Sequence, residues 1–181
     1  MSDQTSLRAS FFEDHFWLRG ATPGLRPTLG QIGLQQFAPY LINSISLSWV
    51  THLASALKVH DMTTTQMRAL AVLSISSPVT INELSQFALT EQSTMSRTLD
   101  TLEEQGFIVR KPRPEDLRVR DVDITQAGRD AFAKVWPTMY DLLAKMFDGI
   151  DSEEYKAFTA TTHKMMSNIR KHGIGSFNRD A

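Results

Sequence analysis

Residues 90–123, TEQSTMSRTLDTLEEQGFIVRKPRPEDLRVRDVD, decide the predicted fold of this chain. Thr90 is a good N-cap residue and Gly106 suits the left-handed position after a helix, so we expect a helix over residues 91–105. Residues 107–109 and 119–124 have strand composition and enclose a segment rich in arginine and proline. The stretch therefore predicts a short helix followed by a β-hairpin.

The predicted helix has one apolar and one polar face. At about 100° per residue, one side carries Met95, Leu99 and Leu102, and the opposite side carries Ser93, Arg97, Asp100 and Glu104. The polar side is thus neutral to basic in its first two turns and acidic afterwards. Helices that read DNA usually touch bases through their N-terminal residues, and phosphates would repel the acidic half. We therefore expect this helix to enter a DNA groove end-on.

The hairpin is locally basic. Five cations in residues 110–120 outnumber Glu115 and Asp116 and give a net charge of +3; they are Arg110, Lys111, Arg113, Arg118 and Arg120. Pro112 and Pro114 stiffen the tip and oppose edge-to-edge strand pairing. A cationic hairpin directly after a helix of this kind is typical of a winged helix.

Two capping boxes precede this stretch, at Thr63-Thr-Thr-Gln66 and Thr80-Ile-Asn-Glu83. Each predicts the start of a short helix. Three capped helices in about forty residues, with a tight turn between the last two, form a helix-turn-helix pattern.

Longer helices are expected on both sides of this core. Apolar residues at four-residue spacing predict a helix from Pro39 to about His60. Thr125 caps a helix to about residue 147, which Pro137 should kink or divide, and a last helix runs from Asp151 to a glycine at 173. The first and last helices carry apolar stripes that a small winged helix alone could not cover, which favours a dimer.

The fold class is therefore mainly α with a small β-wing: a winged helix-turn-helix with N- and C-terminal dimerisation helices. We divide the chain into an aromatic arm and linker (1–38), a dimerisation or linking helix (39–62), the winged helix-turn-helix (63–128) and the C-terminal dimerisation helices (129–181). The arm holds a dense aromatic run at 11–18, which we expect to pack on the body or on a partner subunit, with a membrane surface as the alternative.

Composition narrows the class of protein. The 181 residues are 41% hydrophobic and 22% charged with a net charge of -1, so a packed domain is expected and a DNA-binding role must rest on local charge. The chain has no cysteine, which excludes disulfides and thiol chemistry. No membrane span or secretory leader is apparent, so a cytoplasmic protein is the expectation.

The order of these motifs resembles the MarR (multiple antibiotic resistance regulator) family of bacterial transcription regulators over residues 39–172. The motifs are Gln92-Ser-Thr-Met-Ser-Arg97, Leu102-Glu-Glu-Gln-Gly-Phe107, Asp116-Leu-Arg118 and Ile124-Thr-Gln-Ala-Gly128. Leu117 stands where the family has the first wing arginine. The resemblance implies a homodimer that reads a palindromic operator in double-stranded DNA and acts as a repressor or, alternatively, as an activator.

The resemblance also suggests which residues do this. The expected DNA contacts are Gln92, Ser93, Thr94, Ser96, Arg97, Arg110, Lys111, Arg113, Arg118 and Arg120. Arg118 could instead hold the shape of the wing as a partner of Asp116. In the family a small effector, such as an aromatic acid or a related anion, binds between the dimerisation helices and the winged domain. Candidates to line such a site here are Trp49, His52, Leu53, Met67, Arg68 and Trp136, although residues of these types are more often core or surface residues.

Two other classes compete with this interpretation. A winged-helix protein-interaction module without a DNA role would show no salt-dependent binding to duplex. An all-α enzyme is disfavoured because no nucleophile–base pair, cofactor motif or metal-ligand spacing is present. His52 and His60 are eight residues apart on one helix, about 12 Å of rise, and could bind zinc only with ligands from other helices. We expect no cofactor, no metal and no catalytic residue.

Overall fold

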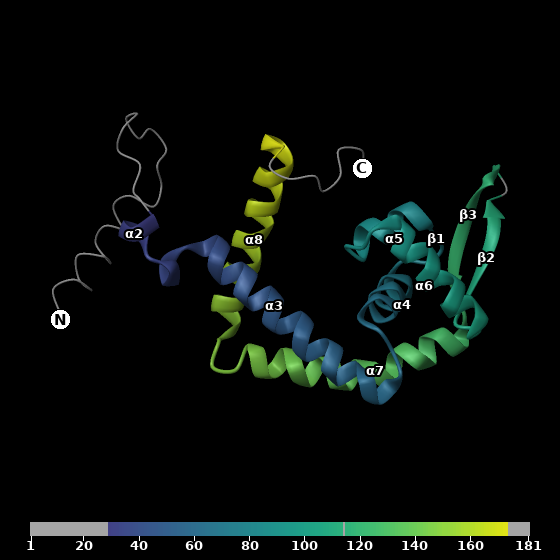
Figure 1. Cartoon of the computed structure of the whole chain (residues 1–181), viewed down its shortest axis with the longest axis horizontal. Helices are drawn as coiled ribbons and strands as arrows, with labels where there is room; N and C mark the ends of the chain where they lie inside the picture. The colour runs from purple at the N-terminus through teal and green to yellow at the C-terminus, as the bar shows by residue number, and fades with distance from the viewer. Residues whose placement is uncertain (1–28, 114, 174–181) are drawn as a thin grey trace. The chain divides into compact units, whose positions relative to one another are not determined.

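The computed structural model describes residues 29–113 and 115–173, so the predicted aromatic run at 11–18 lies outside the described residues. The chain divides into two compact units, with the boundary between His52 and Leu53. Figure 1 shows the elements along the chain, and each unit is described by itself.

The described part of the first unit is helical. The short helix α2 (Leu29–Ile32) and the 3-10 turn η1 (Leu34–Gln36) occupy the end of the predicted linker. Helix α3 (Ala38–Leu57) follows, so Pro39 stands in its first turn as predicted. Its apolar stripe is exposed in this unit at Leu41 and Ile45.

The second unit contains the winged helix-turn-helix. After the last residues of α3 and the 3-10 turn η2 (Lys58–His60) come α4 (Thr64–Ile75), β1 (Val79–Thr80), α5 (Ile81–Phe87) and α6 (Gln92–Glu104). The hairpin of β2 (Ile108–Arg113) and β3 (Asp116–Ile124) follows, and then α7 (Gln126–Met146) and α8 (Ser152–His172). The strands form one antiparallel sheet in the order β1-β3-β2. The predicted mainly α fold with a small β-wing is confirmed.

Side-chain caps begin most of these helices. Thr63 and Thr80 form the two predicted capping boxes: each hydroxyl accepts a backbone N–H from the residue three positions later, whose side chain accepts the cap's own N–H. The prediction of Thr90 as the N-cap of α6 was wrong. Its hydroxyl donates to the carbonyl of Ala88 at 3.1 Å, and Glu91 occupies the cap position without a side-chain hydrogen bond.

The core lies where α4, α5 and α6 meet the sheet. The predicted inner face of α6 is fully buried at Met95, Leu99 and Leu102. These side chains pack in one cluster with apolar residues of the other helices and strands, including Leu70, Leu73, Leu84, Ile108 and Val122. Truncation of one such leucine to alanine typically costs about 2–5 kcal/mol, so this core holds α6 firmly against the sheet.

Helix α7 begins in close contact with the turn that ends α6. The Thr125 N–H donates to the carbonyl of Phe107 at 3.0 Å, and its hydroxyl donates to the carbonyl of Gly106 at 2.7 Å. Gly128 makes this approach possible, because a Cβ there would lie 2.1 Å from the Phe107 oxygen. Of the two outcomes expected for Pro137, a kink or a division, the structure excludes division, because α7 runs through the proline as one helix. Pro137 and Ala133 are exposed, so water can solvate the carbonyl that the proline leaves without a partner.

Candidate nucleic-acid interface

The first two turns of α6 present polar side chains to solvent. Gln92, Ser93, Thr94 and Arg97 are exposed and Ser96 is half-buried. Within the described residues, none of these five side chains has a hydrogen-bond partner, and Arg97 has no ion-pair partner. Their donors and acceptors are therefore free for a ligand that approaches the N-terminal half of α6.

The register of the β2–β3 hairpin, the wing, sets which side chains share a face. Arg110 is opposite Val122, and Lys111 is opposite Asp121. The register then shifts at the tip, where Pro112 pairs with Arg120 and Arg113 pairs with Asp116. The extra residues 117–119 bulge from β3, and Leu117 is 76% exposed there.

Arg110 is bound to α6 rather than free in solution. Its Nη1 lies 2.8 Å from Asp100 Oδ1, its Nε donates to Glu103 Oε2 at 2.9 Å, and its backbone N–H donates to Glu103 Oε1 at 3.0 Å. The side chain of Arg110 is only 16% exposed. We call these three residues the Arg110 cluster. The Arg110 hydrogen bonds hold the pKa of the Glu103 carboxyl below its usual value, and Glu103 and Asp100 raise the pKa of the Arg110 guanidinium.

Arg113 is also paired within the wing. Its Nη2 lies 2.6 Å from Asp121 Oδ1, and its Nε lies 3.1 Å from both carboxylate oxygens. The sequence count of +3 therefore overstates the charge that the wing offers to a partner. Lys111, Arg118 and Arg120 are exposed, and the described residues provide no ion-pair partner for them. Asp116 accepts the backbone N–H of Arg118 at 3.0 Å, so it contacts the main chain of that arginine rather than its side chain.

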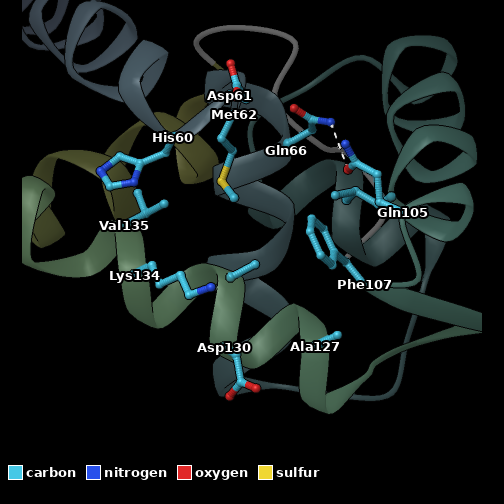
Figure 2. A pocket seen from close by; sticks show the side chains of 12 residues that line it. His60, Asp61, Met62, Gln66, Gln105, Phe107, Ala127, Asp130, Lys134 and Val135 are labelled. Atoms are coloured by element: carbon cyan, nitrogen blue, oxygen red, sulfur yellow. Dashed lines mark hydrogen bonds between the residues drawn. The ribbon is translucent and has the colours of Figure 1, made fainter.

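A cavity of about 450 Å³ lies behind α6, between its last turn and the first half of α7. Its apolar wall includes Met62, Leu102, Phe107 and Val135. Figure 2 shows the polar side chains around it: the amides of Gln66 and Gln105 face each other at 3.5 Å, and His60, Asp61, Asp130 and Lys134 stand at the rim. The remaining lining residues are Ala127 and Ala131 of α7.

Comparison with known proteins places this geometry in a family. The family model described as the MarR family matches residues 60–118, which run from the end of η2 to the wing. A solved MarR-family transcriptional regulator from Silicibacter pomeroyi is 39% identical, with a TM-score of 0.74 over 79% of this chain and 97% of that chain. The chain belongs to the MarR family.

Two further relatives extend the comparison for this MarR-family chain. An HTH-type transcriptional regulator from Bacillus cereus is 29% identical over 116 residues, which are 64% of this chain and 75% of that protein. The solved transcriptional repressor CouR from Rhodococcus jostii, bound to a 23-mer DNA duplex, has a TM-score of 0.66 at 17% identity and covers 78% of this chain and 99% of its own. Because the chain belongs to this family, it is a transcriptional regulator rather than an enzyme.

The six side chains predicted to line an effector site do not line the cavity. Leu53 and Met67 are buried apolar residues, and Arg68 is half-buried on α4. Trp136 is about half exposed and packs in a row between Phe132 and Tyr140, with tilted rings at centroid distances of 6.1 and 6.2 Å. Trp49 and His52 belong to the first unit.

Sequence reasoning missed the cavity because its lining has no period. The side chains come from the ends of α4 and α6, from the segments beside them, and from one side of α7. The described residues contain no group of three or more His, Asp or Glu side chains arranged to hold a metal. No helix in the described ranges is long and apolar enough to cross a membrane.

Proposed function

We propose that this MarR-family regulator binds a palindromic operator as a homodimer in the cytoplasm and represses transcription until a small molecule releases it. The observation that carries the proposal is the exposed, unpartnered N-terminal half of α6. Its Gln92, hydroxyls and Arg97 would face base edges in the major groove. Lys111, Arg118 and Arg120 of the wing would contact phosphates beside it. The repressor CouR shares this fold, and its solved structure contains a bound DNA duplex.

Exposed apolar side chains support the homodimer. Tyr140 on α7 and Tyr155, Phe158, Met166 and Ile169 on α8 are each between about 40% and 56% exposed in the single chain. Apolar residues at such spacing along two helices usually contact a partner. A second copy of the chain, related by a two-fold axis, would cover them and would set two α6 helices about one DNA turn apart. In this proposal residues 39–62 and 129–181 serve the dimer, and residues 63–128 serve DNA.

The cavity supports the response to a ligand. Its apolar wall suits a flat hydrophobic body, and Lys134 with the amides of Gln66 and Gln105 suits a carboxylate or a related anion. Leu102 lies in the last turn of α6 and Gln105 follows the helix directly. A ligand that contacts them would therefore bias the position of α6. We favour this cavity over a site built from Trp49, His52, Leu53, Met67, Arg68 and Trp136.

DNA binding is tested by fluorescence anisotropy with labelled DNA from upstream of the chain's own gene. The proposal requires affinity that falls steeply with salt, because Lys and Arg contacts to phosphate release counterions. Arg97→Ala should weaken specific binding by about 1–3 kcal/mol if Arg97 reads a base. Lys164→Ala, which removes an exposed cation from α8, is the control and should have little effect. Binding that does not change between low and high salt would favour a protein-interaction module instead.

Release by a ligand is tested in the same assay with benzoate and cinnamate as probes. An aromatic acid that dissociates wild-type protein from DNA should lose its effect on Lys134→Gln, which removes the charge and leaves a polar side chain one atom shorter. Equal release from both proteins would exclude the cavity as the site.

A further inference from the structure

Arg97 and Asp100 are three residues apart on α6, so their side chains are neighbours on its exposed face. An unpaired Asp100 would attract the Arg97 guanidinium and would compete with DNA for it. Asp100 is 55% exposed and is held by Arg110 Nη1 at 2.8 Å, whereas Arg97 has no ion-pair partner among the described residues. The cation nearest to Asp100 therefore comes from the wing and not from its own helix.

We propose that Arg110 is a positioning residue that keeps Arg97 free for DNA by holding the carboxylate of Asp100. This role rests on the proposed function, in which Arg97 contacts the operator. It also reassigns Arg110, which the sequence suggested as a direct DNA contact.

The geometry of the Arg110 cluster fits this role. The planar guanidinium reaches two carboxylates at once, Asp100 through Nη1 and Glu103 through Nε and Nη2. Glu103 also accepts the backbone N–H of Arg110, which fixes the strand against the helix from which both acids project. At 16% exposure the guanidinium is mostly covered and its donors are occupied, so it is poorly placed to bind a phosphate.

The cluster also lowers the negative charge beside the DNA. Two carboxylates and one guanidinium carry a net charge of -1 instead of the -2 that Asp100 and Glu103 would carry alone. Loss of Arg110 would thus expose one additional negative charge to the phosphates and allow an Arg97–Asp100 pair. An Arg97–Asp100 pair on the helix would raise the Kd for DNA by about a factor of two. One more negative charge near the phosphates would raise it by about a factor of five. Together these effects should weaken DNA binding roughly tenfold.

A double-mutant cycle on the full-length protein measures this coupling. The probe is a labelled duplex that the wild-type protein selects from a random-sequence library, and its Kd is measured for wild type, Arg110→Ala, Asp100→Asn and the double variant. Asp100→Asn removes one negative charge with or without Arg110, so it should tighten wild-type binding by about fivefold. In the Arg110→Ala protein the same change also frees Arg97, so the gain there should be about tenfold and should restore the lost affinity.

A second cycle asks whether the effect passes through Arg97. In an Arg97→Ala background, the gain from Asp100→Asn in the Arg110→Ala protein should fall from about tenfold to the roughly fivefold that the charge alone supplies. An Arg110 that only stabilised the fold would lower the Tm and the affinity together, and Asp100→Asn would not restore the affinity. If Arg110→Ala does not fold, Arg110→Gln, which keeps one donor for Glu103, takes its place in both cycles.

Several results would overturn the inference. Equal gains from Asp100→Asn in the presence and absence of Arg110 would show independent charges. A larger gain from Asp100→Asn in the wild type than in the Arg110→Ala protein would show that Arg110, once released from Asp100, contacts DNA itself. These outcomes leave the proposed function intact, whereas failure of the wild-type protein to select any duplex would overturn the proposed function and the inference with it.

Discussion

Replacement of Gly128 by alanine tests how α7 is joined to the winged helix. The ideal Cβ would lie 2.1 Å from the Phe107 carbonyl oxygen and 2.9 Å from Ile124 Cγ1, and contacts below 3.0 Å are essentially never observed. The start of α7 must therefore move by about 0.9 Å or more, because the obstructing atom belongs to the backbone. Such a shift would stretch the two hydrogen bonds from Thr125 to the carbonyls of Phe107 and Gly106.

Gly128→Ala should destabilise the folded protein, because its costs exceed its gain. Two weakened hydrogen bonds cost about 1 kcal/mol each, and overpacking costs about 1–3 kcal/mol. The better helix propensity of alanine returns about 1 kcal/mol. The net loss is about 2–4 kcal/mol, which for a chain of this size lowers the Tm by roughly 5–15 °C.

Thermal unfolding followed by circular dichroism measures this loss, at one fixed protein concentration because association would also shift the Tm. Ala133→Gly, at an exposed position of the same helix, is the matched control and should cost only about 1 kcal/mol. A Gly128→Ala protein as stable as the wild type, or more stable, would show that α7 does not approach Phe107 this closely.

Three other predictions concern charge and association. Arg120→Ala should lower the slope of log K against log salt for DNA by about one, whereas Arg113→Ala, whose guanidinium is held by Asp121, should change it little; anisotropy at several salt concentrations compares them. Glu103 has a lowered pKa in the folded state, so its contribution to stability is complete above about pH 4.5 and is lost as the pH falls through the lower folded value. In urea unfolding from pH 6 to pH 3, the free energy of unfolding should therefore fall less steeply for Glu103→Gln than for the wild type. Phe158→Glu should dissociate the proposed dimer, while Ala160→Glu on the opposite face of α8 should not; light scattering after size exclusion distinguishes them.

Local signals in the sequence predicted the helices well. The capping boxes at Thr63 and Thr80 need only residues three positions apart, and both form. The inner face of α6 follows from helix geometry alone, and Met95, Leu99 and Leu102 are buried as expected. The two-residue strand β1 was not predicted, because it is too short to show any alternation.

Interactions between elements were harder to predict. Whether Arg110 faces α6 or solvent depends on the register of the wing, which residue patterns do not specify, so the count of wing cations missed its pairing with Asp100 and Glu103. Thr90 carries the right side chain for an N-cap, but the turn before α6 directs its hydroxyl to Ala88. For both Arg110 and Thr90, the tertiary structure determines which of several possible partners the side chain contacts.

Hydroxyl-radical footprinting on DNA upstream of the chain's own gene tests the central claim most directly, because it reports where the protein lies on both strands. A homodimer that reads DNA with two α6 helices predicts two protected segments, related by two-fold symmetry and centred about 10 base pairs apart, that disappear together with Arg97→Ala. Two results with the wild-type protein would contradict the account. One is a single unsymmetrical protected segment, and the other is no protection at a protein concentration that saturates its binding.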